Sequence, residues 1–194
     1  MKKRGQKGFT LIELLVSVFI FSLIIGGVIN SLLTSVTLQR RIIADQKMFA
    51  ELSYTLEYMS RTLRMARKDI NGTCTSTRNH NYILFDGGNT IRFLNFDNEC
   101  QEFSLRLTGD VMSISERIAT SPNSTDLLPL TFLPLTSANV TVTKLVFSSA
   151  GSAWHSPATN QSKIAIGLRV RPRIGDSAMV FQTVVSQRKL NVPY

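Results

Sequence analysis

The chain has few of the residues that enzymes and metal proteins use. Among its 194 residues there are two cysteines and two histidines, and neither His80 nor His155 has metal ligands at a usual spacing. There is no G-x-S-x-G, no phosphate-binding loop, no H-E-x-x-H and no cysteine paired with a plausible histidine. We therefore expect no metal site, no cofactor and no catalytic activity.

Charge and proline are missing from the N-terminal part. No charged side chain lies between Glu13 and Arg40, and no proline precedes Pro122. Of the 30 residues at 9–38, 19 are Val, Ile, Leu or Phe, and a helix of about 20 apolar residues can cross a bilayer. The sequence predicts one membrane-spanning helix. Gly26-Gly27 would either weaken this helix or allow close packing against another.

A short basic stretch precedes the apolar run. It consists of Lys2, Lys3, Arg4 and Lys7, and the positive-inside bias would keep it in the cytoplasm. A secretory signal peptide has an apolar run of about 7 to 15 residues and a small-residue cleavage site. This run is longer and no A-x-A-like site follows it, which argues against a signal peptide. A plain single-span anchor is the other alternative.

Glu13 is the feature that a plain anchor does not explain. It is a single carboxylate at the start of an otherwise uncharged apolar stretch. Ionisable side chains inside a membrane are costly, and those that are retained usually face a partner rather than lipid. The sequence therefore predicts a partner charge for Glu13.

The residues around Glu13 form a specific motif. Residues 7–15 read KGFTLIELL, which closely resembles the prepilin leader of type IV pilins and pseudopilins. The resemblance implies that a prepilin peptidase cleaves between Gly8 and Phe9, that the new amine of Phe9 is methylated, and that the helix is retained. It also implies that in a filament Glu13 would pair with the Phe9 amine of a neighbouring subunit.

Helical periodicity continues beyond the apolar run. Apolar residues recur at spacings of three, four and seven, which is typical of an amphipathic helix: Leu38, Ile42, Phe49, Leu52, Leu56, Met59, Leu63 and Ala66. A short coiled coil is the alternative. Asn71-Gly72 can stop a helix, so we expect helix over about 9–68.

Beyond Gly72 the period changes to two, which indicates strands. They are expected at 82–85, 90–96, 102–107, 140–147, 164–170 and 179–185, with a hairpin turn at 86–89. The expected fold is α+β, a long N-terminal helix packed on a C-terminal antiparallel sheet. Residues 120–134 and 148–162 read as loops. Trp154 in the second loop either contacts a partner or packs on its own sheet edge.

Cys74 and Cys100 flank the predicted hairpin in a domain expected outside the cytoplasm. A disulfide is therefore favoured over two free buried thiols. Four carboxylates lie near the same hairpin, and we interpret them as a solvated acidic patch, with calcium binding as the alternative: Asp86, Asp97, Glu99 and Glu102.

The predicted organisation is a basic leader at 1–8, a membrane helix at 9–38, an amphipathic helix at 39–70 and a β-rich exported domain at 71–194. The hairpin bracketed by cysteines and the last two strands look like J-type minor pseudopilins and the similar PilW-like minor pilins. This resemblance implies a minor structural subunit of a type IV pilus, a type II secretion pseudopilus or a competence filament, one that helps initiate assembly or forms the tip.

The resemblance also implies the partners and the location. The partners would be other pilin-like subunits, the prepilin peptidase and an inner-membrane assembly platform. The chain would be a single-pass inner-membrane protein that enters a filament. An adhesive or DNA-binding tip is the alternative, and its candidate basic edge is Arg169, Arg171, Arg173, Arg188 and Lys189. The net charge of +9 includes four charges in the leader, so nucleic acid is not the expected partner.

Overall fold

The structure is a computed structural model that describes residues 8–128, 130–150, 162–172 and 178–188. The chain divides into two compact units, Met1–Ile43 and Ala44–Tyr194. The elements in the described residues are α1 (Leu11–Arg64), β1 (Tyr82–Phe85), the 3-10 helix η1 (Asp86–Gly88), β2 (Thr90–Leu94), β3 (Cys100–Thr108), β4 (Val111–Ile118), the 3-10 helix η2 (Ser124–Leu127), β5 (Leu133–Pro134), β6 (Val140–Ala150), β7 (Lys163–Pro172) and β8 (Met179–Ser186).

The described part of the first unit is the start of α1 and the three residues before it. Its most apolar window has a mean hydropathy of 2.6, and none of that window is buried, so the helix is long and apolar enough to cross a membrane. The hydroxyls of Ser17 and Ser22 donate to carbonyls four residues earlier, which lowers the cost of placing them in hydrocarbon. The helix is unbroken through Gly26 and Gly27, where an added Cβ would meet nothing within 4 Å.

In the second unit, one face of α1 is buried. Met48, Leu52, Thr55, Met59 and Leu63 recur at spacings of three or four and contribute to the core. The predicted stripe is confirmed from Leu52 onward. Leu38 and Ile42, which belong to the first unit, are exposed, whereas Phe49 is 55% exposed and its ring centre lies 5.5 Å from that of Phe181.

The helix ends at Arg64, four residues before the expected end, because the chain then pairs with strands. The Arg67 N–H donates to the Leu94 carbonyl at 2.8 Å, and Asp69 and His80 form a second bridge. The last carbonyls of α1 also have partners, since the Tyr82 hydroxyl donates to Leu63 at 2.6 Å. These contacts set the position at which the helix ends and pairing with the strands begins.

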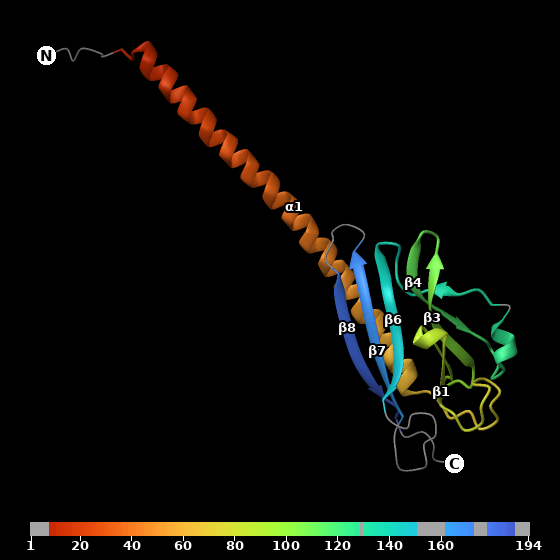
Figure 1. Cartoon of the computed structure of the whole chain (residues 1–194). Coiled ribbons are helices and arrows are strands. Elements are labelled where there is room, and N and C mark those ends of the chain that lie inside the picture. The colour runs from red at the N-terminus through yellow and green to blue at the C-terminus, as the bar shows by residue number, and fades with distance from the viewer. Residues whose placement is uncertain (1–7, 129, 151–161, 173–177, 189–194) are drawn as a thin grey trace. The chain divides into compact units, whose positions relative to one another are not determined.

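The strands form two antiparallel sheets rather than the single sheet expected. One has the order β1-β2-β3-β4-β5 and the other the order β6-β7-β8. Figure 1 shows β6, β7 and β8 running across the last turns of α1. Both sheets and the buried face of α1 share one apolar core, which includes Phe93, Phe103 and Phe147. The α+β prediction is therefore confirmed, with the sheet divided in two.

Two strands are absent from the prediction. β4 pairs with β3 over eight residues, and β5 is a two-residue strand inside the segment predicted as a loop. The sequence does carry a signal for β4, since Met112 and Ile114 on one face alternate with Ser113 and Ser115 on the other. Both serines are buried, so the polar face of this strand is covered rather than solvated.

Gly88 joins the two sheets closely. Its φ is +93°, and a Cβ at this position would lie 2.6 Å from the carbonyl oxygen of Phe147 in β6. Only glycine combines this conformation with such a close approach. The hairpin turn between β1 and β2 is therefore held directly against the second sheet.

Candidate functional site at the N-terminal segment

Gly8 and Phe9 precede the first turn of α1 and are both exposed, with Phe9 at 84% exposure. An added Cβ at Gly8 would meet no described atom within 4 Å. Within the described residues, the folded chain places no demand for glycine at this position. A requirement for glycine here would have to come from another molecule that approaches the backbone.

Thr10 and Glu13 form the start of α1. The Glu13 N–H donates to the Thr10 carbonyl at 3.1 Å and to the Thr10 hydroxyl at 3.4 Å. Thr-x-x-Glu is the pattern of a capping box, in which the residue at the third helical position can be Glu or Gln. Sequence reasoning missed this role, although the spacing of Thr10 and Glu13 could have revealed it.

The Glu13 side chain is exposed in the first turn of the helix, where the helix dipole favours a negative charge. None of the ion pairs found among the described residues involves Glu13. The bond to the Thr10 hydroxyl uses the backbone N–H of Glu13 and leaves its carboxylate out of the cap. The partner charge that the apolar surroundings call for would have to come from a different molecule.

Residues 3–29 match the prokaryotic N-terminal methylation motif. The methylation motif contains Gly8, Phe9 and Glu13 and supports the resemblance of this chain to type IV pilin-like proteins. It covers only the N-terminal segment and none of the second unit. The comparisons with curated proteins and with solved structures found no match.

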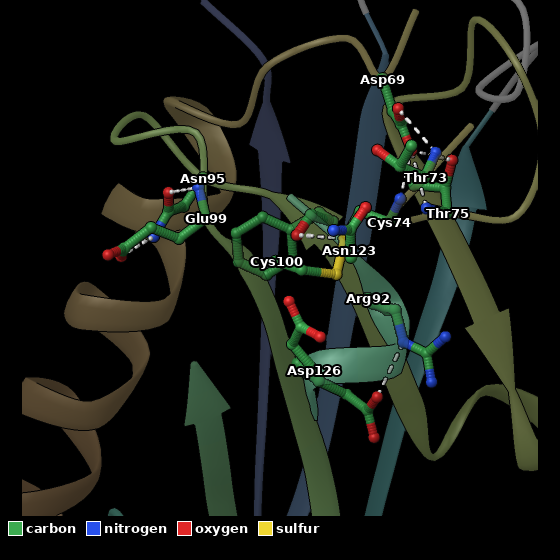
Figure 2. The surroundings of a disulfide bond; sticks show 12 residues. Asp69, Thr73, Cys74, Thr75, Arg92, Asn95, Glu99, Cys100, Asn123 and Asp126 are labelled. Atoms are coloured by element: carbon green, nitrogen blue, oxygen red, sulfur yellow. Dashed lines mark hydrogen bonds and ion pairs between the residues drawn. A yellow bond between two sulfur atoms is a disulfide. The ribbon is translucent and has the colours of Figure 1, made fainter. Parts of the chain in front are cut away.

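In the second unit, a disulfide joins Cys74 to Cys100, with 5.4 Å between the two Cα atoms. It links the loop after α1 to the first residue of β3. Beside it the Asp69 carboxylate accepts hydrogen bonds from four successive backbone N–H groups, those of residues 72–75, and from the Thr75 hydroxyl (Figure 2). The disulfide and Asp69 together hold this loop against the five-stranded sheet.

The predicted acidic patch is wrong for Glu102. Its side chain is buried and pairs with Arg92 at 2.9 Å and Arg117 at 3.3 Å, in one row across β2, β3 and β4. Within the described ranges, no group of three or more His, Cys, Asp or Glu residues could hold a metal ion. Glu102 was misread because its partners lie 10 and 15 residues away along the chain.

The polar face of the five-stranded sheet is covered by Phe132 from the segment before β5. The guanidinium carbons of Arg106 and Arg117 lie 4.7 and 4.4 Å from the centre of its ring. Such cation–π contacts are stronger when they are shielded from water. Phe132 therefore covers the part of this face that carries Arg106 and Arg117.

Tyr58 connects α1 to β4. Its hydroxyl donates to Glu116 at 2.8 Å. Burial, followed by the hydrogen bond to Glu116, raises the pKa of Tyr58 to about 12. Burial alone raises the pKa of Tyr82 as well. Both tyrosines are thus held in their neutral forms within the folded domain.

The remaining predicted site residues are exposed or lie outside the described part of the chain. Arg169 and Arg171 are exposed on β7 and Arg188 follows β8, also exposed. Trp154, Arg173 and Lys189 lie outside the described residues, so a partner contact at Trp154 stays a prediction.

Proposed function

We propose that this chain is a subunit of a type IV pilin-like filament, made as a membrane-anchored precursor and cleaved between Gly8 and Phe9. The methylation motif at residues 3–29 carries this proposal. The free space around Gly8 supports it, because the conformation of the chain does not explain a glycine there, whereas recognition by a prepilin peptidase would.

Glu13 and the cleavage site act together in this proposal. Before cleavage Phe9 has no free amine; after cleavage it carries a positive charge that a neighbouring Glu13 can meet. Removing one partner of a buried ion pair typically costs about 3 to 5 kcal/mol, because the other charge is left buried and alone. The pair would thereby set the register between adjacent subunits.

The exposed apolar surface of the first unit fits the same scheme. Burying each large apolar side chain is worth roughly 1.5 to 3 kcal/mol, which amounts to tens of kcal/mol over this segment. Lipid would cover the helix before assembly, and a bundle of similar helices would cover it afterwards. The segments would be the leader at 1–8, the membrane and filament-core helix at 9–38, its amphipathic continuation at 39–70 and the exported domain at 71–194.

Within the pilin-like proteins we favour a J-type minor subunit that helps initiate assembly or forms the tip. The hairpin β1–β2, bracketed by the disulfide, and the closing strand pair β7–β8 support this assignment. The partners would be other pilin-like subunits, the prepilin peptidase and the inner-membrane assembly platform, with no catalytic activity required of the chain itself.

The test is the intact mass of the protein after expression with a prepilin peptidase. We expect loss of residues 1–8 and the gain of one methyl group. Gly8→Ala should retain the leader, while Gly26→Ala, which also adds a methyl group in open space, should be processed normally. A wild-type protein that keeps residues 1–8, or is cleaved elsewhere, would contradict the proposal.

A further inference from the structure

The outer face of the three-stranded sheet carries a groove that nothing in the described chain fills. Its volume is about 500 Å³, and its lining combines apolar or small residues with polar ones: Val146, Ala165, Gly167, Val180 and Val184, and Ser148, Gln182 and Thr183. The opposite face of β7 is buried in the core through Ile164, Ile166, Leu168 and Val170. The sheet thus covers the domain core with one face, and no described segment covers the grooved face.

Positive charge gathers at the same face. Lys144 and Arg169 line one end of the groove and lie directly opposite each other on β6 and β7. Arg171 and Lys163 are exposed on the same side of β7, and β6, β7 and β8 contain no Asp or Glu. Like charges directly opposite each other destabilise a sheet. An acidic partner would remove this repulsion.

Gly167 at the centre of the groove is not needed by the sheet itself. A Cβ there would make only an ordinary contact, 3.8 Å from the Val146 carbonyl oxygen, and Gly167 has no positive φ. Glycine weakens a strand interior and often marks a place where another group approaches closely. Its position indicates that the groove accommodates a bulky group from outside.

The turn between β2 and β3, residues 95–99, carries an exposed aromatic side chain and acidic residues that complement the groove. Phe96 at this turn is 54% exposed and is followed by the acidic residues Asp97 and Glu99. The turn is rigid, since the Asn95 side chain accepts the Glu99 N–H at 2.8 Å and donates to the Glu99 carboxylate at 3.1 Å. Figure 2 shows Asn95 and Glu99 in this mutual contact. An aromatic side chain on a fixed turn is suited to anchor an interface.

We propose that Phe96 of one copy of this chain inserts into the β6–β7–β8 groove of a second copy, with Asp97 and Glu99 facing Lys144 and Arg169. The groove and the turn are different surfaces, so the contact is heterologous and each copy keeps one half free. Heterologous contacts form rings or open helical arrays rather than closed pairs. The inference goes beyond the proposed function, because it requires neither leader cleavage nor Glu13.

A copy of this chain fits the groove better than nucleic acid does. Single-stranded nucleic acid is bound by positive grooves with aromatic side chains on which bases stack. The groove lining contains no aromatic residue among the described side chains on which bases could stack. The Phe96 ring would contact the valines of the lining, and the acidic residues beside it would face Lys144 and Arg169.

The experiment uses full-length protein reconstituted at one copy per lipid nanodisc, so that α1 stays in lipid and association occurs through the exported part. Mass photometry over a concentration series should show chains of discs for the wild type. Phe96→Ala and Arg169→Glu should each weaken association by roughly 30-fold, the effect expected of a hot-spot residue. Mixing the two variants should restore pairs but not longer chains, because one keeps the groove and the other keeps the turn.

Leu107→Ala is the matched control, because Leu107 is an exposed apolar residue, at 67%, on a different strand. It should associate as the wild type does, and all variants should retain the disulfide and the wild-type circular dichroism. Wild-type discs that stay single, a Phe96→Ala variant that associates normally, or a mixture that does not pair would each overturn the proposal. So would a DNA duplex that binds wild-type discs and displaces the contact.

Discussion

At the scale of single residues, buried carboxylates organise much of the second unit. Asp69 is 2% exposed, and its hydrogen bonds hold the loop that carries Cys74. Glu102 is 1% exposed and neutralises Arg92 and Arg117. A buried charge is tolerated only when it is paired or fully hydrogen-bonded. Asp69 meets this condition through its hydrogen bonds, and Glu102 meets it through its two ion pairs.

Asp69→Ala should lower the free energy of unfolding by about 2 to 4 kcal/mol. The substitution leaves up to four backbone N–H groups without their acceptor, and each unsatisfied buried group is costly. Urea unfolding followed by circular dichroism measures the change. Asp110→Ala, at an exposed turn, should change stability by less than about 0.5 kcal/mol. Equal effects of the two substitutions would mean that the Asp69 network is not stabilising.

Tyr58 gives a prediction about alkaline pH. The pKa of Tyr58 is about 12 in the folded chain and about 10 in the unfolded chain. Folding therefore favours the neutral phenol over the phenolate. The corresponding stability is complete below about pH 10 and is lost as pH rises through about 12. Unfolding free energies measured from pH 8 to 12 should fall less steeply for Tyr58→Phe than for the wild type. Parallel profiles would contradict this assignment.

At the scale of elements, the sequence was sufficient to predict one helix and several strands in which one face is apolar and the other polar. Such patterns predicted α1 from Leu52 onward, the β1–β2 hairpin and the three strands of the second sheet. The same alternation is present in β4, where Met112 and Ile114 alternate with Ser113 and Ser115, although β4 is absent from the prediction. The division into two sheets depends on packing that no local pattern encodes.

Substitutions at the neighbouring turn residues Gly87 and Gly88 distinguish backbone strain from a steric clash. Both have positive φ, but a Cβ added at Gly88 would lie 2.6 Å from the Phe147 carbonyl oxygen, whereas one added at Gly87 would meet nothing within 4 Å. Gly88→Ala should therefore destabilise by clash and backbone strain, and Gly87→Ala by strain alone, about 1 kcal/mol. Thermal unfolding compares them. A Gly87→Ala variant as unstable as Gly88→Ala would show that the close approach does not matter.

At the scale of the whole molecule, the two units differ in whether they bury their own apolar side chains. The first exposes a continuous apolar surface and contains the methylation motif, whereas the second encloses its own core. The sequence could therefore predict Gly8, Phe9 and Glu13 as a site. It could not predict the groove and the 95–99 turn as partners, because both depend on strand register and on which side chains the fold leaves exposed.

The most direct test of the central claim, that Glu13 pairs with the processed Phe9 of a neighbour, is the amount of Glu13→Gln subunit recovered in sheared filaments. The Thr10 hydroxyl accepts from the backbone N–H at position 13, so glutamine leaves this bond in place and removes the charge. We expect Glu13→Gln to insert in the membrane and be processed normally, yet to enter filaments at least roughly 100-fold less than the wild type. Recovery of Glu13→Gln at the wild-type level would contradict the claim.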